Sequence, residues 1–329
     1  MTSIPAPASV LNAPIQLAVG VVGTGAMGRG IMQWAAEAGW VVLAFDSREG
    51  AAKEAAAFVG DILARSLQKG RITTEQLQQT LERINVVEAL ADLGGADVVI
   101  EAIVEDLQIK QVLLHDLESV LNEQAILCTN TSSLSVTSCA KLCRRADRVA
   151  GLHFFNPAPV MRVVEIVKGE HTTPATIERL SQMVAKTKHY AVICADSPGF
   201  VVNHAGRGLY TEGLRIVQDG IATFSDVDKV TRDCLGFPMG PFELFDLTGL
   251  DVSSRVLKEI YESFFQEPRY RPIPLVYRRV EAGLFGRKVG QGFYKYENGQ
   301  KIEAPEPAVP ESTDRAVHVA IASSTDRDR

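Results

Sequence analysis

The segment LAVGVVGTGAMG, residues 17–28, decides the fold. A short apolar run ends there in the spacing Gly-x-Gly-x-x-Gly, and a helical pattern with apolar positions at Ile31, Ala35 and Ala38 follows it. A strand, a glycine-rich turn and a helix in this order are typical of a nucleotide-binding unit, because the backbone N–H groups at the start of the helix attract phosphate. The segment therefore predicts a dinucleotide site in an α/β fold.

The three glycines of this turn have separate roles. Gly23 permits the tight turn, Gly25 lets the backbone approach a pyrophosphate, and Gly28 lets the helix pack closely on the strand. Ala26 and Met27 lie between the last two glycines, where the helix starts. We expect all five residues to contact the cofactor.

Asp46 indicates which dinucleotide binds. It follows Gly28 by 18 residues and ends the next apolar run, where a carboxylate accepts hydrogen bonds from the adenosine ribose. A carboxylate would repel a ribose 2′-phosphate, so the sequence predicts NAD rather than NADP. Arg48 is the opposing signal, because a nearby arginine can accept that phosphate. We interpret Arg48 as a solvated loop charge instead.

Short apolar runs alternate with helical patterns up to residue 198, which predicts a Rossmann-like, doubly wound and mostly parallel sheet. The expected strands are residues 17–22, 41–45, 84–87, 98–103, 125–129, 149–154, 163–167 and 191–195. Between the second and third of these, residues 50–83 have a helical pattern throughout. They predict a pair of helices that leaves the sheet.

The pattern changes at Ser197-Pro198-Gly199, where we place a domain boundary. Residues 15–198 would form the NAD-binding domain and residues 199–302 an all-helical C-terminal domain. Its expected helices are residues 200–217, 225–235, 241–265 and 274–282.

Both ends of the sequence lack a regular apolar pattern. Residues 1–14 and 303–329 are rich in Pro, Ala and polar residues, and we expect them to be flexible tails. The segment RAVHVAIA (315–322) could instead form a strand, in which case the chain would be a fragment or a short version of a longer protein.

Composition excludes several classes of function. The 40 Asp and Glu outnumber the 34 Lys and Arg, and no basic run occurs, so no nucleic-acid partner is expected. No segment approaches the roughly 18 uninterrupted apolar residues of a membrane span, so no membrane partner is expected. The five cysteines are odd in number and lack Cys-x-x-Cys spacing, which predicts free thiols in the cytoplasm and no metal site.

Polar side chains collect where three expected strands end, the edge at which parallel sheets place catalytic groups. The segments are EAIVED (101–106), NTSS (130–133) and HFFNP (153–157). His153 is a candidate general base, because imidazole titrates near neutral pH. Glu165 lies in the apolar run VVEIV, where a buried carboxylate needs a partner, so we expect the two to pair. A core histidine bonded only to the backbone is the alternative.

Eight motifs in order give the chain a family resemblance. They are GTGAMG (23–28), EAIVED (101–106), NTSSLS (130–135), GLHFFNPAPVM (151–161), VEIV (164–167), DSPGFVVN (196–203), FPMGP (237–241) and GRKVGQGFY (286–294). Over residues 17–298 the chain resembles the NAD-dependent L-3-hydroxyacyl-CoA dehydrogenases. The resemblance implies oxidation of an L-3-hydroxyacyl-CoA to the 3-oxoacyl-CoA, as in the β-oxidation of fatty acids, or the reverse reaction.

The resemblance also implies roles for single residues. His153 would be the general base and Glu165 its partner, while Ser132 and Asn203 would bind the 3-oxygen and the thioester region of the substrate. The residues expected around the nicotinamide half of NAD are Glu105, Lys110, Ser132, Asn156 and Lys288. The residues expected to bind the polyanionic CoA are Arg65, Lys69, Lys110 and Ser132. The alternatives are a helix N-cap for Ser132 and solvated surface positions for Asn203, Lys288, Arg65 and Lys69.

A homodimer is a further implication of the resemblance. Helices of the C-terminal domain would form it through apolar surface, which we expect around Phe242, Leu244, Leu250 and Val252.

The acyl group of the substrate has several candidates. The segments FPMGPFELFDLTGLD (237–251) and RYRP (269–272) are most similar to family members of phenylacetate catabolism, whose 3-hydroxyadipyl thioester carries a second carboxylate. The arginines that could bind such a carboxylate are Arg207, Arg215, Arg269 and Arg271. The alternatives are a 3-hydroxybutyryl thioester, a hydroxy compound without CoA, and NAD binding without catalysis.

Overall fold

The computed structural model describes residues 17–302. The expected tails at residues 1–14 and 303–329, including the possible strand at residues 315–322, lie outside the described residues.

An eight-stranded sheet organises the first part of the described chain, in the order β3-β2-β1-β4-β5-β6-β7-β8. Its strands are β1 Ala18–Val22, β2 Val41–Phe45, β3 Ile84–Val86, β4 Val98–Glu101, β5 Ile126–Thr129, β6 Val149–Phe154, β7 Val163–Lys168 and β8 Tyr190–Ala195. Only the β6–β7 pair is antiparallel within this sheet. The predicted Rossmann-like fold is confirmed.

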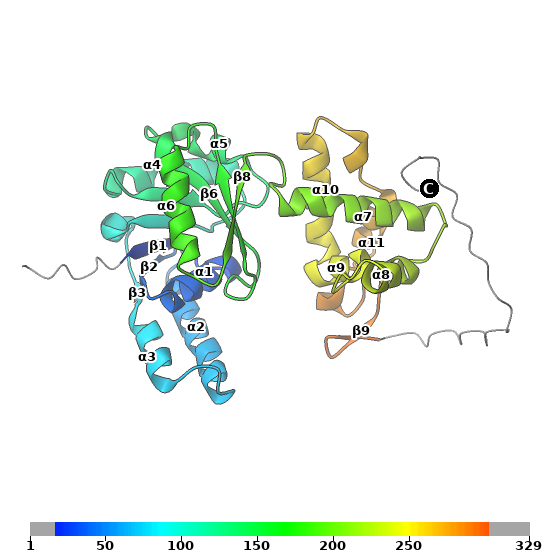
Figure 1. Cartoon of the computed structure of the whole chain (residues 1–329), viewed down its shortest axis with the longest axis horizontal. Helices are drawn as coiled ribbons and strands as arrows, with labels where there is room; N and C mark the ends of the chain where they lie inside the picture. Colours follow the sequence, from blue (N-terminus) through cyan, green and yellow to red (C-terminus); the bar gives the residue numbers. More distant parts are fainter. Residues whose placement is uncertain (1–16, 303–329) are drawn as a thin grey trace, which may run out of the picture.

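Helices cover both faces of the sheet (Figure 1). They are α1 Ala26–Glu37, α2 Ala51–Gln68, α3 Thr74–Glu82, α4 Leu107–Val120, α5 Val136–Cys139 and α6 Pro174–Ala185. One apolar core lies under α1, α2 and α6, and a second lies under α4 and α5. Burial on both faces explains why the central strands β4, β5 and β6 are mostly apolar rather than alternating, whereas the edge strand β8 is apolar but largely exposed. The helices α2 and α3 project away from the sheet, as predicted (Figure 1).

Residues 199–302, here called the helical domain, lie beside residues 17–198, the sheet domain (Figure 1). The helices of the helical domain are α7 Val202–Gln218, α8 Phe224–Asp233, α9 Pro241–Thr248, α10 Leu250–Ser263 and α11 Pro274–Glu281. The hairpin β9 Tyr296–Glu297 and β10 Gln300–Lys301 follows them. The prediction of one helix over residues 241–265 is wrong. Gly249 has φ +91°, which no α-helix accommodates, so the chain breaks there into α9 and α10.

The core of the helical domain corrects a second expectation. Phe242 and Leu250, which we expected on an apolar surface, are completely buried, whereas Val252 is exposed. The buried carboxylate of Asp246 accepts hydrogen bonds from the N–H groups of Phe293 and Tyr294, at 2.8 Å each. This carboxylate therefore attaches the C-terminal segment to α9.

Replacing Asp246 by Asn should destabilise the helical domain. The amide has one acceptor oxygen and turns an NH₂ group toward a backbone donor, leaving a buried N–H unsatisfied. We expect the free energy of unfolding to fall by about 1 to 3 kcal/mol in urea denaturation. The control Asp233→Asn lies at an exposed position at the end of α8 and should change stability by less than about 0.5 kcal/mol. Equal stability of the two variants would refute the role of Asp246.

Candidate active site

The glycine-rich turn lies between β1 and α1. Gly23 has φ +84°, and a Cβ at Gly28 would lie 1.8 Å from the carbonyl oxygen of Gly23. A Cβ at Gly25 would meet no described heavy atom within 4 Å beyond its immediate chain neighbours. The backbone at Gly25 therefore faces open space at the start of α1, where a pyrophosphate can approach the N–H groups of the helix.

Asp46 lies beside this turn, just beyond the end of β2. Its Oδ2 accepts hydrogen bonds from the N–H (2.7 Å) and the hydroxyl (2.9 Å) of Thr24, and its Oδ1 accepts one from the N–H of Arg48 (3.0 Å). Partial burial raises the pKa of Asp46, but these hydrogen bonds outweigh it and hold the pKa below its usual value. The carboxylate is therefore ionised and fixed next to the turn.

A cavity of about 500 Å³ opens beside Asp46. Its apolar lining comes from Val22, Phe45, Leu90, Ile103, Ile109, Val112 and Leu113. Apolar walls suit the flat adenine base, while the adjacent carboxylate suits the ribose. The turn, Asp46 and the cavity together fit the adenosine half of NAD.

Arg48 does not face this site as a free cation. Its guanidinium forms two hydrogen bonds to Glu54, at 3.1 and 2.6 Å, on the exposed surface. Glu54 thus compensates the charge of Arg48 on the surface, which agrees with the interpretation of Arg48 as a surface charge.

His153 and Glu165 lie on neighbouring strands. The antiparallel pairing of β6 with β7 places the two residues directly opposite each other. His153 Nδ1 lies 2.7 Å from Oε2 of Glu165, and the residues are 5% and 0% exposed. The structure thus brings the predicted pair together, and the carboxylate sets the orientation of the imidazole.

The second oxygen of Glu165 holds the start of the helical domain. Its Oε1 accepts hydrogen bonds from the N–H groups of Val201 (2.9 Å) and Val202 (2.8 Å), where α7 begins. Asn203 is the next residue of that helix, so it lies beside the His153–Glu165 pair. We did not predict this contact from the sequence. The only available signal was the motif DSPGFVVN at the domain boundary.

Glu105 organises the loop after β5. Its Oε1 accepts hydrogen bonds from the Thr131 hydroxyl (2.7 Å), the Ser132 N–H (2.9 Å) and the Ser133 hydroxyl (3.1 Å). Burial raises the pKa of Glu105, but these donors and Lys110 outweigh it, so the pKa lies below its usual value. Glu105 and Ser132 therefore lie together at the carboxyl edge of the sheet, as expected.

Lys110 is deeper in the protein than expected. It is 1% exposed, and its Nζ lies 2.9 and 2.8 Å from the two carboxylate oxygens of Glu101 and 3.4 Å from Glu105. This burial argues against the predicted contact between Lys110 and CoA. The ammonium instead compensates the buried Glu101 and helps to position Glu105.

The remaining predicted residues lie at the surface or in the helical domain. Asn156 is exposed just after β6, and Arg65 and Lys69 are exposed at the outer end of α2. Lys288 forms an ion pair with Asp251 of α10, at 2.7 Å. This ion pair holds the ammonium of Lys288 against α10, within the helical domain.

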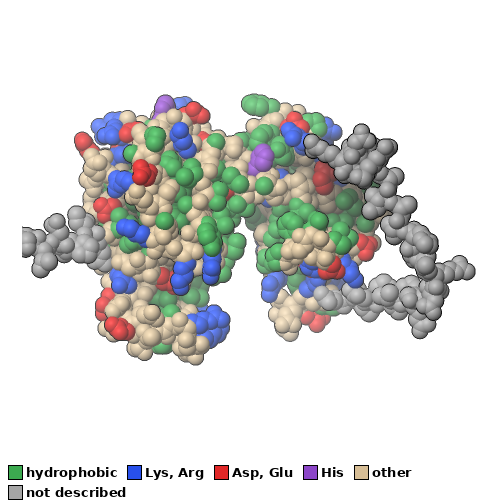
Figure 2. Space-filling model, viewed as in Figure 1, with side chains coloured by type: hydrophobic (Ala, Val, Ile, Leu, Met, Phe, Trp, Pro, Cys, Tyr) green, Lys and Arg blue, Asp and Glu red, His purple; other side chains and the backbone are tan. Residues whose placement is uncertain are grey.

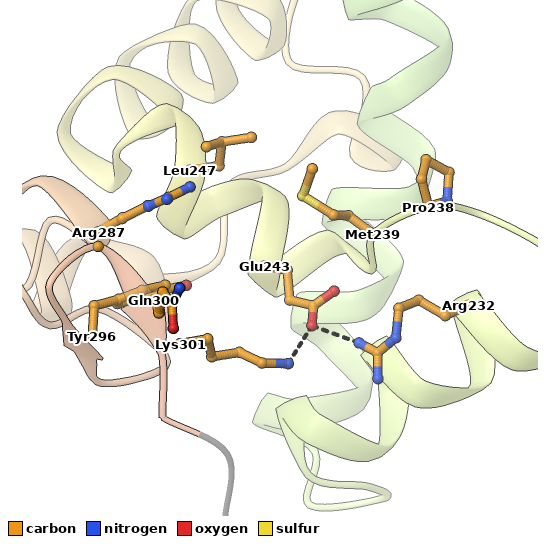
Figure 3. A pocket seen from close by; sticks show the side chains of 10 residues that line it. Arg232, Pro238, Met239, Glu243, Leu247, Arg287, Tyr296, Gln300 and Lys301 are labelled. Atoms are coloured by element: carbon orange, nitrogen blue, oxygen red, sulfur yellow. Dashed lines mark hydrogen bonds and ion pairs between the residues drawn. The ribbon is translucent and has the colours of Figure 1, made fainter.

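A separate cavity of about 500 Å³ lies in the helical domain (Figure 3). Glu243 contacts both Arg232 and Lys301 there, each at 2.6 Å. The cavity is lined entirely by residues of the helical domain, and we assign it no part in the site.

Comparison with known proteins identifies the family. The model of the 3-hydroxyacyl-CoA dehydrogenase NAD-binding domain matches residues 18–197, and that of the C-terminal domain of the same family matches residues 199–296. The chain belongs to the 3-hydroxyacyl-CoA dehydrogenase family. The match assigns NAD as the cofactor of the sheet domain.

Two relatives and one solved structure illustrate the similarity within the 3-hydroxyacyl-CoA dehydrogenase family. The chain is 38% identical over 89% of its length to the 3-hydroxyadipyl-CoA dehydrogenase of Escherichia coli, of which it spans 62%. It is 36% identical over 86% of its length to the 3-hydroxybutyryl-CoA dehydrogenase of Bradyrhizobium diazoefficiens, of which it spans 97%. The crystal structure of 3-hydroxybutyryl-CoA dehydrogenase from E. coli matches 90% of the chain with a TM-score of 0.86 at 38% identity, and the chain covers 63% of it.

Residues 17–302 contain neither a membrane-spanning helix nor a metal-binding cluster. No helix in this range is long and apolar enough to cross a membrane. No group of three or more His, Cys, Asp or Glu side chains in the same range is arranged to hold a metal ion.

Gly25→Ala should weaken NADH binding without unfolding the protein. The added methyl group meets no described atom, but it fills the space through which a pyrophosphate approaches the backbone. We expect the NADH dissociation constant in a fluorescence titration to rise about tenfold or more, which is roughly 1.4 kcal/mol. The control Gly60→Ala lies on α2, where the nearest atom is 3.8 Å away, and it should bind NADH as the wild type does. Wild-type affinity in Gly25→Ala would place the pyrophosphate elsewhere.

Proposed function

We propose that this protein interconverts L-3-hydroxyacyl-CoA and 3-oxoacyl-CoA with NAD, using His153 as the general base and Glu165 as its partner. The observation that supports this most directly is the buried 2.7 Å contact between the two side chains, next to the start of α7. A buried imidazole held by a carboxylate at the edge of a nucleotide-binding sheet is suited to proton transfer beside the cofactor.

The carboxylate determines which imidazole nitrogen reacts. We assign the proton to Nδ1, which donates it to Oε2 of Glu165, so Nε2 presents its lone pair to the substrate. Nε2 then accepts the proton of the 3-hydroxyl group, and the ionised Glu165 stabilises the imidazolium that forms. NAD, held by the glycine-rich turn and Asp46, would supply the hydride acceptor for the same carbon. In the reverse direction His153 returns the proton to the 3-oxygen.

Ser132 and Asn203 are proposed to bind the substrate next to the His153–Glu165 pair. The N–H of Ser132 is held by Glu105, which fixes the position of the serine, and Asn203 follows the residue whose N–H binds Glu165. Their hydroxyl and amide donors would stabilise negative charge on the 3-oxygen during reduction. Glu105, Asn156 and Lys288 remain proposed contacts of the nicotinamide half.

CoA is proposed to lie along the helix pair α2–α3. Arg65 and Lys69 are exposed four residues apart on the outer part of α2, where they can meet phosphates. The helix pair leaves the sheet next to β3, so these cations lie far along one side of the sheet domain (Figure 1).

This proposal has two forms, which differ in the acyl group of the substrate. The E. coli relative is a 3-hydroxyadipyl-CoA dehydrogenase and the Bradyrhizobium relative a 3-hydroxybutyryl-CoA dehydrogenase, at nearly equal identity. Identity alone therefore does not choose between phenylacetate catabolism and short-chain β-oxidation. A cytoplasmic location is proposed with either, because all five cysteines are free thiols.

His153→Gln should abolish most of the activity while leaving NADH binding nearly unchanged. Glutamine cannot accept the proton, so turnover should fall by about 10² to 10⁴. The measurement is NADH oxidation with acetoacetyl-CoA and 3-oxoadipyl-CoA. The control His171→Gln, at an exposed position, should retain wild-type turnover.

Three results would contradict this proposal. Full turnover in His153→Gln would mean that another group is the base. Turnover of 3-oxo acids without any CoA would favour a dehydrogenase of non-CoA substrates. NADH binding with no turnover of any thioester by the wild type would favour a protein that binds NAD without catalysis.

The helical domain is proposed to form a homodimer through α7 and α8. An apolar groove of about 310 Å³ between these helices is lined by Leu209, Ile216, Val227, Val230 and Leu235. Val230 and Leu235 are 54% and 63% exposed. Figure 2 shows hydrophobic side chains gathered on this domain, and exposed apolar surface of this kind is typical of an interface.

Leu235→Glu should shift the protein from dimer to monomer. A charge in the groove would have to be desolvated on association, which weakens the contact. Light scattering after size exclusion measures the mass at micromolar concentration. The control Val160→Glu, equally exposed but on the sheet domain, should remain a dimer. A monomeric wild type, or a dimeric Leu235→Glu, would refute this interface.

A further inference from the structure

We propose that Arg207 binds a carboxylate at the far end of the acyl chain, so that the preferred substrates are thioesters whose acyl tail carries a second negative charge. The proposal rests on the proposed function, because it concerns the acyl tail of the same substrate. It names the residue that recognises that tail, and it favours a 3-hydroxyadipyl thioester over a 3-hydroxybutyryl thioester as the substrate.

Arg207 is a buried cation that has no counter-ion among residues 17–302. It lies on α7 and is 6% exposed, and its Nη1 is buried with no hydrogen-bond partner in the described part of the chain. Its Nε donates to the carbonyl oxygen of Asn203 (3.0 Å), and the guanidinium lies 4.5 Å from the ring centroid of Tyr210. Neither contact supplies a negative charge.

Arg148 and Arg279 also have a buried Nε without a hydrogen-bond partner in residues 17–302, but a carboxylate acts on each of them, Glu118 on Arg148 and Asp246 on Arg279. Arg148, equally buried at 6% exposure, lies 3.9 Å from the carboxylate of Glu118. Burial lowers the pKa of Arg207, and among residues 17–302 Tyr210 is the ionisable group that acts against this. A cation taken out of water without a partner destabilises the fold. The aromatic contact alone recovers little of that cost, so a ligand anion is the missing partner.

The position of Arg207 relative to the pair fits an acyl tail. The first residues of α7 bind Glu165, and Asn203 follows them. Arg207 is four residues after Asn203, on the same face of the helix and about 6 Å further along its axis. A substrate whose reacting carbon lies between His153 and Asn203 can therefore extend its tail along α7 toward Arg207.

The length of the tail decides which substrates reach the guanidinium. A 3-hydroxybutyryl group ends one carbon beyond the reacting carbon and carries no charge. A six-carbon dicarboxylic acyl group places its carboxylate three carbons beyond the reacting carbon, at about the rise of one helical turn. A carboxylate there can accept two parallel hydrogen bonds from the guanidinium.

The other arginines that the sequence offered for this role are engaged or exposed. Arg215 pairs with Glu212 and donates to the carbonyl oxygen of Pro268 (2.9 Å). Arg269 pairs with Glu267 (2.9 Å), and Arg271 is exposed. Of the four, Arg207 is the one that combines burial with a donor lacking any described partner.

The test compares two thioesters of equal chain length. NADH oxidation is measured with 3-oxoadipyl-CoA and with 3-oxohexanoyl-CoA, which replaces the terminal carboxylate by a methyl group. The wild type should prefer 3-oxoadipyl-CoA in kcat/KM. Arg207→Met should lower the ratio of the two kcat/KM values by about 100-fold, because the carboxylate would be desolvated without a partner.

Two further variants separate recognition from stability. Arg207→Lys keeps the charge but not the two parallel donors, so its ratio should lie between those of the wild type and Arg207→Met. Arg271→Met, at an exposed position, should keep the wild-type ratio. Removing an uncompensated buried charge should leave the Tm of Arg207→Met unchanged or higher, whereas a purely structural arginine would lower it.

Each outcome decides between distinct conclusions. If the wild type reduces neither of these thioesters nor acetoacetyl-CoA, the proposed function fails; if it reduces acetoacetyl-CoA alone, the role of Arg207 is overturned and the proposed function stands. If it reduces both but prefers 3-oxohexanoyl-CoA, or if Arg207→Met leaves the ratio unchanged, the role of Arg207 is overturned and the proposed function stands. If Arg207→Met does not fold, the ratio for Arg207→Lys decides: a value below that of the wild type supports the role of Arg207, and an equal value overturns it.

Discussion

The rest of the site depends on one fully buried carboxylate, that of Glu165. One of its oxygens contacts His153 Nδ1 and the other accepts two N–H groups from the start of α7. A buried anion is costly unless each oxygen finds donors, and here the donors come from a strand of the sheet domain and a helix of the helical domain. The same charge therefore orients the base and attaches the second domain beside it.

The sheet topology makes this arrangement possible. Strands β1 to β6 are parallel, so their carboxyl ends gather the glycine turn, Glu105, Ser132 and His153 at one edge. Strand β7 reverses direction and pairs with β6, which places Glu165 opposite His153. If β6 and β7 were parallel, a long crossover connection between them would be needed to place Glu165 at the same position.

Features with a local signature could be predicted from the sequence. The strands, the glycine turn and Asp46 follow from short-range patterns, and Glu165 stood out as an acid in an apolar run. The break at Gly249 could not be predicted, because the helical pattern continues through it and only the backbone conformation reveals it. The burial of Phe242 and Leu250 also escaped prediction, since apolar residues on a helix do not show which face packs inward.

Charge compensation was the least predictable property, because it depends on residues that meet only in the folded chain. Lys110 follows an apolar strand and reads as a cofactor contact, yet Glu101 neutralises it in the core. Arg207 is one of four arginines that the sequence offers for a substrate carboxylate, and the sequence does not show that it is buried. Both cations are desolvated, but within residues 17–302 Lys110 has a carboxylate partner and Arg207 has none. We therefore assign Lys110 a structural role, because its charge is compensated, and Arg207 a role in ligand binding, because its charge is not. That difference connects the packing of α7 to the choice of substrate.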